Sequence, residues 1–262
     1  MPPGVNARFI HACQNVCMTL TITNRELRLE VAHNVRHMGG YTTPEGRTTT
    51  DTIIRSAGLQ RLTPHGLGTL ADHGVKAIVD LRSRAERERD VTPDPSVAGI
   101  RHVFAPVFEE DQSPVGLDAE FPGYFVVYQR MLETGRDAYR VLFETVSETD
   151  GKVVFHCAAG KDRTGVAAAL MLRLAGVDEA TVIEDYAHSF HLLRPLLDEW
   201  LPRMSEQGID QSRALQLMAS PPEDMTNTLA HIERLYGGAA AYLESVGVSA
   251  ATLSAVRAKL VA

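Results

Sequence analysis

The sequence predicts an α/β fold with a central, mainly parallel sheet, helices on both of its faces, and a helical C-terminal region. Three observations lead to this prediction. Short apolar runs of strand length alternate with longer helical patterns as far as Gly176. Two of these runs, Lys76–Leu81 and Lys152–Cys157, are mostly apolar, which is typical of strands buried on both faces. From Asp178 to Ala262 the pattern is helical throughout.

Length and composition set limits on the class of protein. The chain has 262 residues, of which 44% are hydrophobic and 23% charged, so it can form one large α/β domain. We expect a loosely ordered extension over residues 1–20 and a single domain over 21–262. The formal net charge of −7 disfavours a nucleic-acid-binding protein. Any phosphate site must therefore be a local positive region on an acidic chain.

Membrane and export signals are weak. No apolar stretch approaches the roughly 20 residues of a membrane-spanning helix, so we expect no integral membrane segment. The first 23 residues hold one arginine and an apolar run that polar residues interrupt, which is a poor secretory signal. The sequence thus favours a cytoplasmic protein and leaves secretion open.

The N-terminal part predicts strands and one capped helix. Residues Glu26–Glu30 alternate in polarity like an edge strand. Residues Thr42–Arg55 predict a pair of strands around a turn at Pro44-Glu45-Gly46. Thr63 and Pro64 supply the first positions of a helix that we expect to stop at Gly74.

The middle of the chain continues the alternation of strands and helices. Lys76–Leu81 predicts a buried strand, and the capping box Ser83-Arg84-Ala85-Glu86 begins a helix directly after it. Arg101–Val107 predicts another strand. Tyr124–Val146 predicts one long or broken helical region.

The last strand leads into the most informative segment. A turn at Asp150-Gly151 precedes the strand Lys152–Cys157, and the buried helix Thr164–Ala175 is closed by Gly176. The remainder predicts four or five helices. Its apolar stripes predict core positions at Leu229, Ile232, Leu235 and Leu243.

Residues 156–165, His-Cys-Ala-Ala-Gly-Lys-Asp-Arg-Thr-Gly, form a strand–loop–helix junction. In such a junction the loop amides and the helix dipole converge on an anion. We expect the substrate phosphate to be bound by Ala158, Ala159, Gly160, Lys161, Asp162, Arg163 and Thr164. In parallel sheets ligands bind beyond the carboxyl ends of the strands, where Cys157 falls.

The residue types in this loop indicate nucleophilic catalysis. The loop amides, the helix start and Arg163 all favour the thiolate of Cys157, which is the reactive form. The planar fork of Arg163 can bind two phosphate oxygens at once. Thr164 is expected to donate its hydroxyl to the sulfur or to cap the helix. His156 is expected to orient the Cys157 backbone.

The loop resembles the His-Cys-x5-Arg-Ser/Thr signature of the protein tyrosine phosphatase superfamily. More narrowly, the chain is similar to bacterial atypical tyrosine/dual-specificity phosphatases. Further similar segments are Asn34–Tyr41, Ile54–Leu59, Val79–Ser83 and Tyr236–Gly238 with Tyr242-Leu243. The resemblance covers about residues 26–262 and implies a cysteine-phosphatase-like fold that dephosphorylates phosphotyrosine through a phosphocysteine. His37 stands where the family usually has Asp, so any role of that carboxylate is in doubt.

The general acid has three candidates. Asp162 is the first, because similar lipid phosphatases of the myotubularin type carry Asp at this place of the loop. Asp80, at the end of its strand, is the second, with an ion pair to Arg82 or Arg84 as the alternative role. Asp111 and Asp118 are the third. They lie in the acidic stretch from Phe108 to Pro122, which we expect to be a mobile cover over Cys157.

Lys161 bears on the substrate. By resemblance, a lysine in this loop is found in phosphatases that act on phosphoinositides, where it could meet a second phosphate. The expected partner is therefore a phosphorylated protein, with a phosphoinositide as the alternative substrate. Two other classes stay open: a non-catalytic phosphate-binding module, and another cysteine enzyme such as a sulfurtransferase or arsenate reductase.

No cofactor or metal ion is expected. His11, Cys13 and Cys17 could suggest a metal site near the N-terminus, but no second group of ligands follows them, and an irregular extension explains them better.

Overall fold

The computed structural model describes residues 25–27, 29, 32–44, 46–48, 52–108, 123–206 and 208–261. The expected extension over residues 1–20 lies outside this part of the chain. No helix within the described part is both long and apolar enough to cross a membrane.

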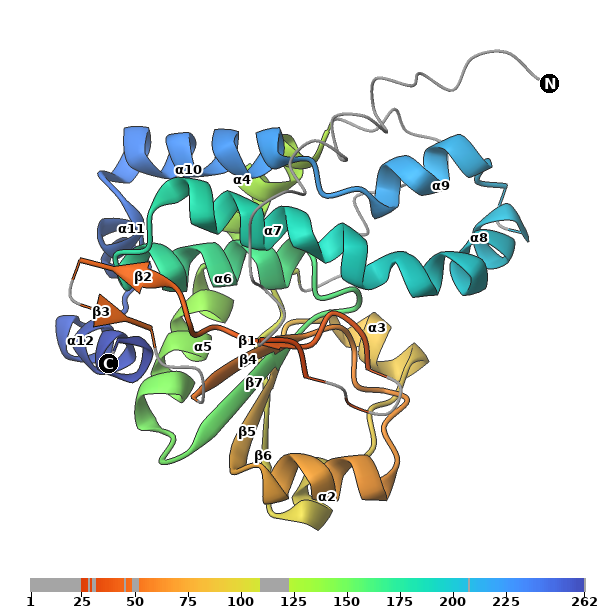
Figure 1. Cartoon of the computed structure of the whole chain (residues 1–262), viewed down its shortest axis with the longest axis horizontal. Helices are drawn as coiled ribbons and strands as arrows, with labels where there is room; N and C mark the ends of the chain where they lie inside the picture. Colours follow the sequence, from red (N-terminus) through yellow and green to blue (C-terminus); the bar gives the residue numbers. More distant parts are fainter. Residues whose placement is uncertain are drawn as a thin grey trace.

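A five-stranded sheet forms the centre of the fold (Figure 1). Its strand order is β1-β4-β7-β5-β6. Strands β4, β7, β5 and β6 run parallel, whereas the short β1 is antiparallel to β4. The bounds are β1 Arg36–His37, β4 Ile53–Ser56, β5 Val75–Asp80, β6 Arg101–Phe104 and β7 Lys152–His156. The predicted mainly parallel sheet is confirmed, and β7 lies at its centre.

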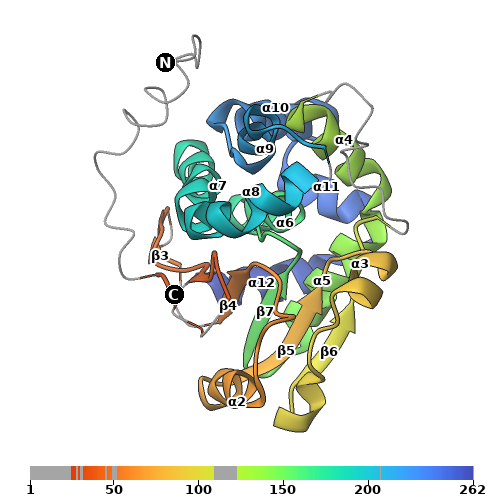
Figure 2. The same ribbon diagram turned by 90° about the vertical axis from the view of Figure 1, so that its right-hand side faces the viewer.

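Helices cover both faces of this sheet (Figures 1 and 2). Along β5, Ala77 and Val79 join a large core with α4, α5, α6 and α12, whereas Val75 and Ile78 join a smaller core under α2. Between the strands the helical elements are α2 Pro64–Asp72, α3 Arg84–Arg89, η2 Pro95–Ala98, α4 Tyr124–Thr134, α5 Arg136–Glu148 and α6 Asp162–Leu174. The alternation of side chains along each strand therefore gives the sheet two separate apolar faces.

The C-terminal region stacks against the α6 side of the sheet, and one end of it extends away from the sheet (Figure 1). Its elements are α7 Glu179–Leu193, η3 Arg194–Leu196, α8 Leu197–Glu206, α9 Gln211–Met218, α10 Pro222–Tyr236, α11 Ala239–Ser245 and α12 Ala250–Leu260. These are six α-helices within the described residues, one or two more than the sequence predicted. Leu229, Ile232 and Leu243 are buried as expected, but Leu235 is 52% exposed, so its assignment to the core was wrong.

The local signals for two helix starts are confirmed. Thr63 accepts a hydrogen bond from the backbone N–H of Gly66 at the start of α2. Ser83 and Glu86 form both hydrogen bonds of the predicted capping box at the start of α3. Both caps are short-range contacts, which is why the sequence revealed them.

Two expectations for the N-terminal part were wrong. The segment expected as an edge strand forms only isolated bridges, Glu26 with Arg36 and Leu29 with Ala32, among its described residues. The residues of the expected strand pair over Thr42–Arg55 belong to two different sheets. Its first part is a small hairpin of β2 Thr42–Thr43 and β3 Gly46–Arg47. Its last part enters β4, which pairs with β7 in the main sheet because all four of its residues are buried.

The helical region predicted as long or broken is broken: Gly135 divides it into α4 and α5. A Cβ atom at this position would lie 2.7 Å from the carbonyl oxygen of Met131 and 2.8 Å from Cγ1 of Val107. Real Cβ atoms do not approach other heavy atoms this closely, so the close passage of the backbone requires glycine.

Replacing Gly135 by alanine should therefore destabilise the fold. We expect Gly135→Ala to lower the free energy of unfolding by about 1–3 kcal/mol, because the new methyl group overpacks the junction. Gly68, in the middle of α2, is the matched control, since a Cβ there meets nothing within 4 Å. Gly68→Ala should raise stability by about 0.5–1 kcal/mol. Urea unfolding measures both changes, and equal effects of the two substitutions would contradict the packing argument.

Candidate functional site

Cys157 lies at the carboxyl end of the central strand, as predicted. β7 ends at His156, the loop begins at Cys157, and α6 begins at Asp162. The Cys157 side chain is buried, and its thiol is free. His156 Nδ1 lies 3.1 Å from the carbonyl oxygen of Cys157, which agrees with the expected orienting role of His156.

The carbonyl groups of the loop point outward and are held there. Asn34 Nδ2 donates to the carbonyl oxygens of Ala159 and Gly160, at 3.1 and 2.9 Å. Arg55 Nη2 donates to the Gly160 oxygen at 2.9 Å, and the backbone N–H of Gly58 donates to the Ala158 oxygen at 2.9 Å. Because the N–H and C=O of a planar peptide point in opposite directions, the following amides face the inside of the loop. A concave set of amides of this kind binds anions.

Gly160 has a backbone conformation that favours glycine. Its φ is +66°, in the left-handed region that glycine adopts at little cost. A Cβ atom here would lie 2.4 Å from the carbonyl oxygen of Ser56. The loop glycine is thus required both by its backbone conformation and by the close approach of β4.

A buried ion cluster around Asp185 of α7 supports these anchors. Arg36 Nε donates to Asp185 Oδ1 at 2.8 Å, Tyr41 OH donates to the same oxygen at 2.7 Å, and Arg55 Nη1 donates to Oδ2. Arg36 also donates to the side-chain oxygen of Asn34, which orients the Asn34 amide toward the loop. Two of the segments that carry the family resemblance, Asn34–Tyr41 and Ile54–Leu59, therefore meet at one carboxylate.

The charges of this cluster shift its pKa values strongly. Burial by itself raises the pKa of Asp185, but Arg36 and Arg55 outweigh burial and hold that pKa well below its usual range. Burial, together with the charge of Arg36, lowers the pKa of Arg55 to about 10. Asp185 therefore stays ionised throughout the physiological range.

Arg163 is held by a carboxylate that the sequence analysis did not include among the site residues. Its Nη2 donates to Oε1 of Glu86 at 2.8 Å, and its Nη1 donates to Oε2. Burial opposes the charge of Arg163, but the hydrogen bonds to Glu86 and the proximity of Cys157 outweigh it and raise the pKa of Arg163. The sequence showed Glu86 only as the last residue of a capping box, yet both of its carboxylate oxygens also orient the Arg163 fork.

Asp162 lies at the first turn of α6 with one carboxylate oxygen fixed. Tyr128 OH of α4 donates to Oδ1 at 2.6 Å, and Lys161 Nζ lies 3.3 Å from the same oxygen. Tyr128 OH is also 2.7 Å from the hydroxyl of Tyr186. In the described part of the chain, Oδ2 has no hydrogen-bond partner, and the side chain is 24% exposed. Asp162 is thus held in place with one oxygen available for proton transfer.

Lys161 does not have the role that the sequence suggested. Its side chain is buried, and its Nζ donates to the carbonyl oxygens of Leu217 and Ala219 at 2.9 and 2.7 Å. The ammonium group also lies 3.8 Å from the centre of the Tyr124 ring. These carbonyls belong to the C-terminal end of α9, where a cation is favourable. Lys161 therefore anchors a C-terminal helix beside the loop, and its contacts do not support the expected meeting with a second phosphate.

Thr164 and Asp80 also differ from expectation. Helix α6 begins at Asp162 with Lys161 in the capping position, so Thr164 is not the cap. The buried hydroxyl of Thr164 has no hydrogen-bond partner in the part that the structure describes, which leaves its expected bond to sulfur unformed. Asp80 is fully buried and accepts from Arg82 through both carboxylate oxygens, at 3.0 and 2.7 Å. Burial raises the pKa of Asp80, but His156 and Arg82 outweigh burial and lower it, which favours the ion-pair role over the role of acid.

The remaining predicted residues lie elsewhere. Asp111, Asp118 and almost all of the expected mobile cover over Cys157 fall outside the described residues. His37 lies in β1, paired with Ile54. Tyr128 and Asp185 were missed because no local pattern marks them. Their partners are 34 and up to 149 positions away along the chain.

Comparison with known proteins identifies relatives over most of the chain. The sequence profile of the tyrosine phosphatase family matches residues 27–262. A tyrosine-protein phosphatase of Nostoc commune is 31% identical over 225 residues, which cover 80% of this chain and 74% of that protein. The triple specificity protein phosphatase PtpB of Mycobacterium tuberculosis is 25% identical over 79% of this chain and 90% of its own length. A crystal structure of P. aeruginosa TpbA is 17% identical over 75% of this chain and 86% of that chain, with a TM-score of 0.33.

The Asp185 cluster yields a prediction about stability. Asp185→Asn leaves two buried guanidinium groups without a counter-charge, so we expect the free energy of unfolding at pH 7 to fall by about 3–5 kcal/mol. Asp137 is the matched control, because its carboxylate pairs with Arg140 while 91% exposed. Asp137→Asn should change stability by less than about 0.5 kcal/mol.

The sign of the pH dependence follows from the lowered pKa of Asp185. Its ionised form stabilises the fold above the unfolded-state pKa of about 3.9, and this contribution is lost as the pH falls below that value. The stability difference between wild type and Asp185→Asn should therefore shrink by roughly 1 kcal/mol between pH 6 and pH 3. Denaturant unfolding at both pH values measures it, and a constant difference would contradict the lowered pKa.

Proposed function

Because the chain belongs to the tyrosine phosphatase family, we propose that it hydrolyses phosphotyrosine in proteins through a covalent phosphocysteine on Cys157. The family makes it a phosphatase of the hydrolase class. The observation that carries the proposal is the loop from Cys157 to Arg163, in which the carbonyls of Ala158, Ala159 and Gly160 are turned outward beside a buried thiol. A module that only binds phosphate would need the amides but not the thiol.

The first step is attack by the thiolate. The loop amides and the start of α6 bind the phosphate oxygens and favour the negative charge on sulfur. The sulfur forms a bond to phosphorus while the bond from phosphorus to the tyrosine oxygen breaks. Glu86 fixes the Arg163 guanidinium by two hydrogen bonds, so that its remaining N–H groups can bind the phosphate oxygens as they become equatorial.

The leaving phenoxide needs a proton, which we assign to Asp162. Tyr128 and Lys161 both contact Oδ1, so the proton belongs on Oδ2. In the second step a water molecule attacks phosphorus, and the Asp162 carboxylate takes the proton of that water. The bond from sulfur to phosphorus breaks, which releases phosphate and restores the thiolate.

Tyr128 acts in this scheme as a positioning residue. It is fully buried, and its hydroxyl bridges Asp162 and Tyr186. Since it contacts the carboxylate and not the phosphate, its loss should disturb proton transfer more than substrate binding.

A broader specificity belongs to the same proposal. The relative from Mycobacterium tuberculosis is named a triple specificity phosphatase, which supports activity on phosphoserine and phosphothreonine besides phosphotyrosine. A phosphoinositide remains the alternative substrate, but Lys161, the residue that suggested it, is bound to α9. Comparing hydrolysis rates for phosphotyrosyl peptides, phosphoseryl peptides and phosphoinositides is the direct test of this specificity.

Replacing the nucleophile tests the proposed function. Cys157→Ser should reduce hydrolysis of an aryl phosphate by at least about four orders of magnitude, because the hydroxyl is a far weaker nucleophile. The variant should still bind inorganic phosphate in calorimetry, since the amides and Arg163 remain. Cys17→Ser is the matched control and should keep full activity. Turnover retained in Cys157→Ser, or lost from the wild type on addition of a chelator, would refute the mechanism.

The choice of acid can be tested by varying the leaving group. Asp162→Asn should lower kcat by about two to four orders of magnitude on phosphates with poor leaving groups, and much less on activated aryl phosphates. Tyr128→Phe should show the same leaving-group dependence more weakly, with KM little changed. Tyr186→Phe is the matched control and should not show this dependence. Asp80→Asn should show no leaving-group dependence. If the dependence appears in Asp80→Asn and is absent in Asp162→Asn, the acid has been assigned to the wrong residue.

A further inference from the structure

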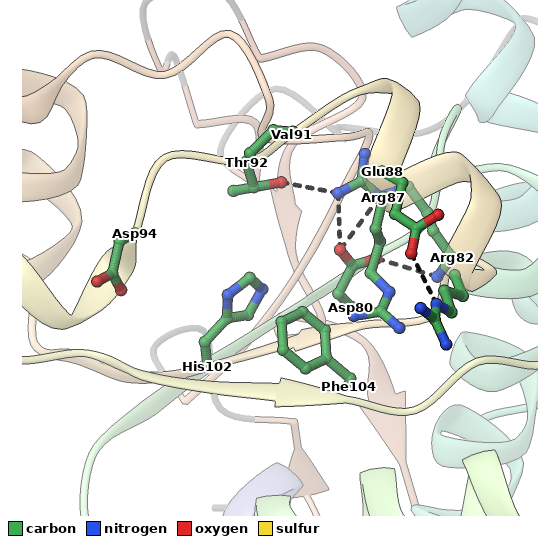
Figure 3. A pocket seen from close by; sticks show the side chains of 10 residues that line it. Asp80, Arg82, Arg87, Glu88, Val91, Thr92, Asp94, His102 and Phe104 are labelled. Carbon is green, nitrogen blue, oxygen red and sulfur yellow. Dashed lines mark hydrogen bonds and ion pairs between the residues drawn. The ribbon is translucent and has the colours of Figure 1, made fainter.

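An open cleft of about 670 Å³ lies between α3, the segment that follows it, and the edge strand β6 (Figure 3). Its lining residues are Asp80, Arg82, Arg84, Arg87, Glu88, Val91, Thr92, Asp94, His102 and Phe104. Cys157 is not among them. Asp80 and His102 line this cleft, and His156 Nε2 lies 3.8 Å from Oδ2 of Asp80.

Three neighbouring strands bring these side chains together. Asp80 is paired with His156 across β5 and β7, and His102 on β6 is paired with Ile78 of β5. Side chains at paired positions of parallel strands share a face of the sheet. One ligand atom from each of Asp80, His102 and His156 lies within 4.8 Å of the others. The group is therefore fixed by the sheet and not by a flexible loop.

The hydrogen bonding leaves acceptors without donors at this point. The carbonyl oxygen of Cys157 can only accept, so His156 Nδ1 must carry the hydrogen, and in the neutral ring Nε2 has a free lone pair. Nε2 of His156 and Nε2 of His102 are both buried without a hydrogen-bond partner in the described part of the chain. A buried polar atom without a partner calls for an explanation, and a bound water or ion is one of them.

The carboxylate of Asp80 has one position left. A carboxylate offers about four lone-pair positions. Three hydrogens point at it, those on the backbone N, Nε and Nη2 of Arg82, and the Nε hydrogen is shared between Oδ1 at 3.0 Å and Oδ2 at 3.2 Å. One position is therefore left, and Oδ2 lies 3.8 Å from Nε2 of His156.

We propose that Asp80, His102 and His156 bind a divalent transition-metal ion of the Zn²⁺ type. Two imidazoles and one carboxylate, completed by water, are a usual ligand set for zinc. The outer contacts also fit, because metal-bound histidines commonly donate their other N–H to a backbone carbonyl, and ligating carboxylates are themselves hydrogen-bonded. His156 meets the first condition through Cys157, and Asp80 meets the second through Arg82. The cleft gives the ion and its water access from solvent.

The surrounding charges set the strength of binding. The charge of Asp80 is already neutralised by Arg82. Because Arg87 also lines the cleft, the surroundings are positive and repel a divalent ion. The ligand atoms must also move closer, since bonds of about 2.0–2.1 Å bring them within roughly 3.4 Å of one another. Binding is therefore weaker than in structural zinc sites with four protein ligands. The binding does not depend on the proposed phosphatase activity.

The test is a titration of the full chain with Co²⁺, whose visible d–d absorption reports ligand number and geometry in place of Zn²⁺. All three cysteines are first replaced by serine, because thiolates bind Co²⁺ themselves. This Cys13→Ser, Cys17→Ser, Cys157→Ser protein should give a d–d band that saturates at one equivalent and disappears on addition of Zn²⁺. Adding His102→Ala or His102→Gln should weaken Co²⁺ binding by more than about tenfold.

Phe104→Leu is the matched control for the His102 variants. Phe104 stacks on His102 at a centroid distance of 4.4 Å but offers no ligand atom, so its replacement should leave the d–d band unchanged. Far-UV circular dichroism should show that all variants are folded. The proposal is overturned if the cysteine-free protein gives no d–d band, or if both His102 variants bind Co²⁺ as tightly as their parent.

Discussion

The loop geometry depends on one buried carboxylate, that of Asp185. Two arginines share it, so the cluster of Arg36, Arg55 and Asp185 carries a net positive charge beneath the loop. Arg55 carries part of this charge and donates a hydrogen bond to the carbonyl oxygen of Gly160. Removing one partner of a buried ion pair costs about 3–5 kcal/mol, so the cluster fixes Arg55 firmly, and Arg55 together with Asn34 holds the loop carbonyls. The loop is thus supported from beneath, where an N-terminal segment and α7 meet.

Three consecutive charged residues of the loop serve three different parts of the structure. Lys161 reaches the end of α9, Asp162 contacts Tyr128 of α4, and Arg163 contacts Glu86 of α3. Near the start of a helix, successive side chains point in directions about 100° apart, so neighbours in sequence do not share a target. This is why the positive charge of Lys161 suggested a ligand contact in the sequence, whereas the folded chain uses it to fix a helix.

The sequence predicted features that depend on neighbouring residues and missed those that depend on distant ones. The loop, its flanking strand, and the caps at Thr63 and Ser83 are local, and the structure has them. The separation of β4 from the preceding hairpin depends on its pairing with β7, about one hundred positions later. The role of Glu86 was hidden because a capping box explains the residue completely until Arg163 is seen beside it.

The alternation of side chains along β7 also separates two kinds of chemistry. His156 shares a face of the sheet with Asp80 and His102, whereas the next residue, Cys157, packs into the core on the other face. A single peptide group therefore lies between the Cys157 loop, the proposed phosphate site, and the histidine cluster. Asp80 belongs to the histidine side, where Arg82 holds it, and is therefore badly placed to protonate a leaving group bound over Cys157. Asp162 lies on α6, the helix that begins at the loop, so the sheet does not separate it from Cys157. This placement is the strongest structural reason to prefer Asp162 as the acid.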